Sequence, residues 1–171
     1  MQVNVAGLLK LSIGAERKFD VDEDINIDGK SVRVTGMAQM VRTDRGILVK
    51  GDFKAELEVE CSRCLEPFHC PVNIKFEEEF FPEIDVVTGL SLDFPEEQAG
   101  YFTISPNHII DLDEAIRQYA LLDVPMKPLC KNECAGLCPS CGKDRNHGCC
   151  ECPPPEIDPR LAVLNKFQKQ G

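Results

Sequence analysis

The chain has 171 residues, a hydrophobic fraction of 43% and a net charge of −10. This length is enough for one hydrophobic core with a small appendage. No run of about 18 apolar residues is present, which excludes a transmembrane helix, and the N-terminus lacks the basic start and apolar stretch of a secretory signal. We therefore expect a cytoplasmic protein, and its acidity disfavours simple electrostatic binding to nucleic acid.

Alternation of apolar and polar residues predicts strands through the first half of the chain. The candidates, in chain order, are residues 1–11, 18–22, 31–42, 47–61 and 72–80, of which the first two are the weaker. A TDRG turn at residues 43–46 separates two of them. The side chains expected to face the core are Val32, Val34, Ala38, Met40, Ile47, Val49, Phe53, Ala55, Leu57, Val59, Cys61, Val72, Ile74, Phe76 and Phe80. The pattern predicts an antiparallel β-meander, or a barrel-like sheet, with one packed face.

Negative charge is concentrated between Phe76 and Ile116, where eleven acidic residues occur and no Lys or Arg. The acidic residues are Glu77, Glu78, Glu79, Glu83, Asp85, Asp93, Glu96, Glu97, Asp111, Asp113 and Glu114. Such a block is typical of a solvated loop, or of a surface that attracts a basic partner. In the second case, Glu77, Glu78 and Glu79 are the residues expected to contact the partner.

A helix is predicted over residues 112–123, after a loop-like stretch at residues 82–106 that is rich in proline and glycine. Its apolar face would contain Leu112, Ile116, Tyr119 and Leu122. Asp111 followed by Glu114 predicts a capping box at its start.

A second, short helix is predicted within residues 157–171, with Asp158 as its cap. Its apolar stripe would pack into the core or dock against another protein. The expected fold class is α+β, in two domains. Residues 1–125 would form a β-rich core with one helix, and residues 126–171 a cysteine-rich, zinc-binding segment with the short helix.

The ten cysteines favour metal binding, since disulfides are rare in the reducing cytoplasm, and zinc is the default ion. The spacing of the C-x2-C pairs is the strongest indication of metal binding. The preferred grouping places Cys61, Cys64, Cys130 and Cys134 in one site, and Cys138, Cys141, Cys150 and Cys152 in a second. An alternative grouping joins Cys130, Cys134, Cys138 and Cys141 and leaves the first pair alone. Cys61 could also be an ordinary buried cysteine.

Three residues near these thiols are left outside the ligand sets. Cys70 and Cys149 would be structural or free thiols, and His147 a surface group or a hydrogen-bond partner of a ligand. Coordination by cysteines alone closes a zinc site to water and weakens the ion as a Lewis acid. The sequence also contains no H-E-x-x-H, G-x-S-x-G or phosphate-binding loop. We therefore predict a protein that is not an enzyme.

Three motifs resemble the bacterial YceD family: CSRCLEPF after an acidic alternating strand, PLC followed by CAGLCPSCGKD, and DPRLAVLNKF near the C-terminus. The resemblance extends over residues 20–168. Members of that family are described as large-ribosomal-RNA accumulation proteins. The resemblance thus implies a role in accumulating the ribosomal RNA of the large subunit.

Three functional hypotheses follow. The first is a non-enzymatic factor in large-subunit biogenesis, stabilised by one or two zinc ions, whose acidic surface binds a basic ribosomal protein. The second is a zinc-dependent RNA-binding module that contacts ribosomal RNA precursor through Lys143 and Arg145. The third is a thiol or zinc redox sensor that uses Cys70 and Cys149.

Overall fold

The computed structural model describes residues 1–92, 102–153 and 160. The chain forms two compact units. The first contains Met1–Val59 and His69–Pro128, and the second contains Glu60–Phe68 and Leu129–Gly171. The two-domain division at residues 125 and 126 stays a prediction. None of the helices in the described part is long and apolar enough to cross a membrane.

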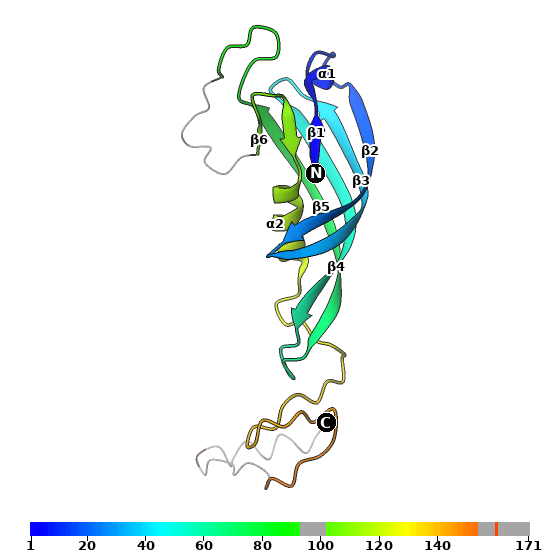
Figure 1. Ribbon diagram of the computed structural model, residues 1–171, viewed down its shortest axis with the longest axis vertical. Coiled ribbons are helices and arrows are strands. Elements are labelled where there is room, and N and C mark those ends of the chain that lie inside the picture. The colour runs from blue at the N-terminus through cyan, green and yellow to red at the C-terminus, as the bar shows by residue number, and fades with distance from the viewer. Residues whose placement is uncertain (93–101, 154–159, 161–171) are drawn as a thin grey trace. The chain divides into compact units, whose positions relative to one another are not determined.

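The first unit is built on one curled sheet of seven strands (Figure 1). The strands are β1 (Gln2–Asn4), β2 (Glu16–Ile27), β3 (Lys30–Arg42), β4 (Ile47–Glu60), β5 (Pro67–Pro82), β6 (Thr103–Ile104) and β7 (Ile109–Asp111). Their order across the sheet is β1-β7-β6-β5-β4-β3-β2. The predicted antiparallel pattern is confirmed for β2–β3–β4, but the sheet as a whole is mixed, because β6 pairs in parallel with β5.

Period-two alternation explains the long strands and their register. Along β4, burial alternates with exposure from Ile47 to Leu57, and the same holds from Val72 to Phe76 in β5. All but one of the predicted core positions are buried, and Val59 is partly buried against the core. The turn before β4 also forms as predicted: the Thr43 amide donates to the Gly46 carbonyl at 3.0 Å.

The first eleven residues differ from the strand predicted there. The strand β1 ends at Asn4, and a one-turn helix, α1 (Ala6–Leu9), follows it. Leu8 and Leu9 are buried in the core. The apolar pair is adjacent in sequence, a spacing that suits a helical turn capping the core and not a period-two strand.

Gly36 allows β3 and β4 to lie close together, and Gly51 leaves room for the Phe53 and Phe76 rings. A Cβ atom on Gly36 would lie 2.2 Å from the Asp52 carbonyl oxygen, and one on Gly51 would lie 2.5 Å from the Phe53 ring. Glycine inside a strand marks such a close approach.

The helix α2 (Asp113–Asp123) covers the core with Ile116 and two alanines. Leu122 was predicted on this face but is 76% exposed. The capping box is also wrong: the Glu114 carboxylate accepts from Arg117 at 2.8 Å and from Gln118 at 2.7 Å, and does not reach back to the start of the helix. Instead, the Asp111 carboxylate accepts from the Asp113 amide at 3.0 Å.

Two predictions lie outside the described residues. They are the terminal helix within residues 157–171 and the part of the acidic block formed by Asp93, Glu96 and Glu97.

Candidate metal centre

The second unit brings eight of the ten cysteines together in two groups of four. The groups are Cys61, Cys64, Cys130 and Cys134, and Cys138, Cys141, Cys150 and Cys152. Within each group the four sulfur atoms lie within 4.8 Å of one another. This membership matches the preferred grouping from the sequence. The alternative grouping is not the one formed, because Cys130 and Cys134 lie with the first pair.

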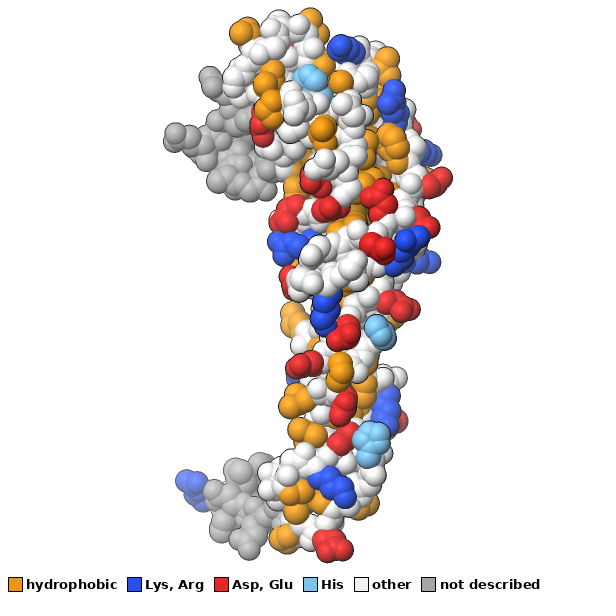
Figure 2. Space-filling view, in the orientation of Figure 1, with side chains coloured by type: hydrophobic (Ala, Val, Ile, Leu, Met, Phe, Trp, Pro, Cys, Tyr) orange, Lys and Arg blue, Asp and Glu red, His pale blue; other side chains and the backbone are white. Residues whose placement is uncertain are grey.

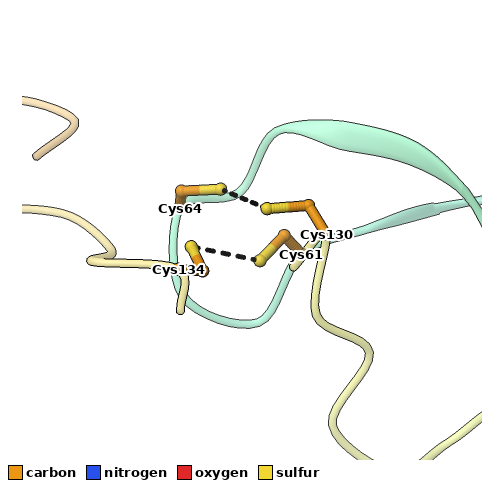
Figure 3. Close-up of side chains that lie close together, drawn as sticks. All are labelled: Cys61, Cys64, Cys130 and Cys134. Carbon is orange, nitrogen blue, oxygen red and sulfur yellow. Dashed lines mark hydrogen bonds between the residues drawn. The ribbon is translucent and has the colours of Figure 1, made fainter. Parts of the chain in front are cut away.

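The first group joins the hairpin tip between β4 and β5 to the segment that follows α2 (Figure 3). The Sγ atoms of Cys61 and Cys134 are 3.8 Å apart, and those of Cys64 and Cys130 are 3.7 Å apart. A tetrahedral zinc with Zn–S bonds of about 2.3 Å places its sulfur ligands about 3.8 Å apart. The spacing of the thiols therefore fits a zinc ion.

The two C-x2-C motifs fold into the same knuckle. In the first, the Cys61 amide donates to the Glu66 carbonyl at 3.0 Å, and the Leu65 amide donates to the Cys61 carbonyl at 2.9 Å. In the second, the Cys138 amide donates to the Lys143 carbonyl at 2.8 Å, and the Gly142 amide donates to the Cys138 carbonyl at 2.9 Å. The turn reverses through a left-handed residue at the same place in each knuckle, Leu65 (φ 62°) and Gly142 (φ 72°).

Backbone contacts fix the two halves of the first group to each other. The Leu137 amide donates to the Arg63 carbonyl at 3.1 Å, and the Arg63 guanidinium donates to the Cys134 carbonyl at 2.9 Å. Gly136 lies between them with φ 67°, and a Cβ there would be 3.0 Å from the Arg63 carbonyl oxygen. Glycine is thus favoured at this position by both conformation and space.

The thiols within each group titrate very differently. Amide hydrogen bonds, first from Cys130 in one group and from Cys141 in the other, lower the pKa of Cys61 and of Cys138 to about 6. Desolvation, together with the neighbouring thiols, raises the pKa of Cys130 to about 12. The Cys141 side chain, together with desolvation, raises the pKa of Cys152 to about 12 as well. Four thiolates this close repel one another unless a cation lies between them. The donor set therefore fits a thiophilic dication.

A side chain outside the ligand set also contacts the first group. The Asn146 amide nitrogen donates to the Cys134 sulfur at 3.3 Å, and its oxygen accepts from the Ala135 amide at 2.9 Å. This hydrogen bond lowers the pKa of the Cys134 thiol. Sequence reasoning missed Asn146, since nothing in its spacing marks it. His147, which was considered for such a role, is exposed and lies 3.6 Å from Asp144.

The two remaining cysteines lie apart from the ligand sets. Cys70 is buried in β5 of the first unit, where its thiol lies 3.9 Å from the Pro71 carbonyl oxygen. Cys149 is exposed in the second unit, beside Cys150. Lys143 and Arg145, the predicted RNA contacts, are also exposed there.

The predicted acidic contact residues do not share one surface. The alternation of β5 places Glu77 and Glu79 on its outer face, where they pair with Lys50 at 2.9 Å and Arg45 at 3.3 Å. Glu78 lies on the inner face and accepts a hydrogen bond from the Tyr119 hydroxyl of α2. Each carboxylate therefore has a partner within the chain, which reduces the charge that it can offer to another molecule.

The fold and the site together define a curled mixed sheet with a candidate zinc module made of two cysteine knuckles. A family model described as "Large ribosomal RNA subunit accumulation protein YceD" matches residues 49–168. The chain belongs to this family, as the sequence motifs predicted.

Relatives include proteins of mycobacteria and of Bacillus subtilis. The chain is 35% identical over 123 residues to uncharacterized protein Rv2926c of Mycobacterium tuberculosis, an alignment that covers 70% of this chain and 54% of that protein. It thus spans about half the length of the mycobacterial relatives. Uncharacterized protein YlbN of Bacillus subtilis is 26% identical over 170 residues, with 91% of each chain covered. No solved structure matches this chain.

Proposed function

We propose that this protein is a non-enzymatic, cytoplasmic factor in biogenesis of the large ribosomal subunit, in which two zinc ions stabilise the second unit and the acidic first unit binds a basic ribosomal protein. The proposed role in the large subunit rests on membership of the family. The eight cysteines would hold the zinc, and their spacing supports this assignment. Zinc bound by four thiolates has no open position, which suits a structural role.

The charge of the chain supports a basic protein as the partner. The first unit contains 22 acidic residues against 12 Lys and Arg, whereas the second contains seven of each. The whole net charge of −10 therefore belongs to the first unit. Ribosomal proteins are generally basic, and complementary charge gives fast, salt-sensitive capture.

The outer face of β2 is the best-placed acidic surface for this capture. Val21 and Ile25 are buried, so the alternation turns Asp20, Asp22 and Asp24 to the outer face, where all three are exposed. Arg33 pairs with Asp22 at 2.7 Å and with Asp24 at 3.7 Å, and leaves this row with a net negative charge. On the visible face of the first unit, red acidic side chains gather among fewer blue ones (Figure 2).

The test is co-purification of the tagged protein from its own cells across a salt series, with protein and RNA both identified. A basic large-subunit protein released by moderate salt supports the proposal. The triple variant Asp20→Asn, Asp22→Asn, Asp24→Asn should release it at lower salt, and Glu77→Gln with Glu79→Gln should have a smaller effect because those carboxylates already have partners. Lys54→Gln, on the same side of the sheet, is the matched control and should not weaken capture. Normal large-subunit RNA levels in a deletion strain would contradict the whole assignment.

Direct binding of RNA by the second unit is the second candidate. Arg145 lines a cavity of about 480 Å³ together with Ser140 and Pro139, and Lys143 lies nearby in sequence. However, each zinc with four thiolates has a net charge of about −2, so a loaded second unit would be acidic overall. Ribosomal RNA retained without a ribosomal protein, and lost in Lys143→Ala with Arg145→Ala, would favour this candidate.

A further inference from the structure

The second cysteine group has a fifth thiol beside it. The cavity of about 480 Å³ is lined by three of the four grouped cysteines, Cys138, Cys150 and Cys152, and also by Cys149. The first group has no such neighbour among the described residues, since Cys70 lies in the other unit. We propose that Cys149 is a reserve metal ligand, able to replace Cys150, and that the second site exchanges its metal more readily than the first. This inference rests on the proposed binding of zinc.

Burial separates the two sites. In the first group, Cys61, Cys64 and Cys134 are 0%, 5% and 3% exposed, and only Cys130 is exposed to solvent. In the second group only Cys138 is buried: Cys141 is exposed, and Cys150 and Cys152 are partly exposed. A competing thiol or a chelator can reach three cysteines of the second site through the cavity, whereas three of the four cysteines of the first site are buried. The second site is therefore the one at which ligand exchange can begin.

The described part of the chain gives few hydrogen bonds to the backbone that carries Cys149 and Cys150. Among the described residues, the only hydrogen bond to the backbone of residues 148–152 comes from the Lys143 ammonium to the Cys149 carbonyl, at 3.4 Å. Gly148 is the first residue of this segment and has φ 144°, and a Cβ there would meet nothing within 4 Å. A shift by one residue, which brings Cys149 to the place of Cys150, would cost little backbone hydrogen bonding.

The exchange needs no oxidant. The Cys149 thiol loses its proton and its sulfur bonds to zinc, while the bond from zinc to Cys150 breaks and the Cys150 sulfur takes up a proton. The ion keeps four thiolate ligands and its charge.

The test counts zinc per chain in the full-length protein, by elemental analysis and native mass spectrometry. Wild type and Cys149→Ser should hold two ions, and Cys138→Ser should hold one. Cys150→Ser should still hold two, because Cys149 replaces the missing ligand, and Cys149→Ser with Cys150→Ser should fall to one. The matched control is Cys70→Ser with Cys150→Ser, which removes the other spare thiol and should keep two.

Two results would overturn the assignment of Cys149 as a reserve ligand. They are a single zinc in Cys150→Ser, or two zinc ions in the double variant that lacks both Cys149 and Cys150. Release to a chromogenic chelator should show one fast ion and one slow ion, and the slow ion should survive in Cys138→Ser. Equal rates would overturn the proposed difference between the sites. A wild-type chain without zinc would instead contradict the metal binding on which the inference rests.

Discussion

At the scale of single residues, Asn146 shows how a side chain outside the ligand set orients a cysteine. Its amide contacts the Cys134 sulfur at 3.3 Å and the Ala135 amide at 2.9 Å, so that one side chain holds both a ligand and its backbone. The Asp144 carboxylate in turn accepts from the Asn146 amide nitrogen at 2.7 Å. Partners of this kind fix ligand orientation and tune the charge on the sulfur.

We predict that Asn146→Ala weakens zinc binding at the first site about 10- to 100-fold, the usual effect of losing a hydrogen-bond partner of a ligand. The measurement is competition with a chelator of known zinc affinity. His147→Ala is the control: this side chain is exposed and, among the described residues, pairs only with Asp144, so the variant should leave the affinity unchanged. An effect of equal size in both variants would contradict the role of Asn146.

The lowered pKa values of Cys61 and Cys138 predict how zinc loading depends on pH. Both pKa values are about 6, so these two sulfurs are already thiolates at pH 7.5 and zinc displaces no proton from them. Below pH 6 they are protonated, and zinc must displace those protons as well. We expect zinc content after dialysis to be full at pH 7.5 and to fall steeply from pH 6 to pH 5. Content that is unchanged at pH 5 would contradict the prediction.

The sequence contains part of the information about the ligands. The C-x2-C spacing of Cys61–Cys64 and Cys138–Cys141 is local, and each pair does form a knuckle. The pairing of the first knuckle with Cys130 depends on the path of the chain through β5 and α2, which spacing does not encode. Asn146 could not be foreseen for the same reason.

At the scale of elements, the two knuckles differ in the residue that takes the left-handed conformation. Both turn through a left-handed residue, which is Leu65 in the first and Gly142 in the second. The left-handed conformation costs a residue with a Cβ about 1 kcal/mol or more, and costs glycine almost nothing. The first knuckle therefore contains backbone strain that the second lacks.

We predict that Leu65→Gly tightens zinc binding at the first site by up to about fivefold, which corresponds to about 1 kcal/mol. Leu65 is 59% exposed, so little packing is lost. Gly142→Ala is the matched variant and should weaken the second site by a similar factor, because a Cβ there meets no atom within 4 Å and only the conformation changes. Competition with a chelator measures the zinc affinity of both variants. Weaker binding in Leu65→Gly would contradict the inference that Leu65 is strained.

The long strands could be predicted because one face of each is buried. The period-two pattern of β3, β4 and β5 follows from that single packed face. The short strands β6 and β7 have two and three residues, too few for a period to show. The parallel pairing of β5 with β6 was missed because it depends on the connection between them.

At the scale of the whole molecule, the two units are stabilised by different means. The first has a continuous core of buried apolar residues from the sheet, α1 and α2. Among the described residues of the second, the buried ones are chiefly cysteines, with a small cluster around Cys61, Cys64 and Cys134. An apolar core of that size cannot offset the conformational entropy of its segment without metal.

We therefore predict that removal of zinc unfolds the second unit and leaves the first folded. Metal binding contributes on the order of 10 kcal/mol to the folding of small zinc modules, so the described residues 129–153 should lose their order without it. Hydrogen exchange with and without a chelator is the measurement. Amides of β3 and β4 up to Val59 should keep their protection, and those of the two knuckles should lose it. Cys138→Ser should abolish protection around the second knuckle only, because the first group keeps all four of its cysteines. Loss of protection throughout the sheet on chelation would show that the two units fold as one.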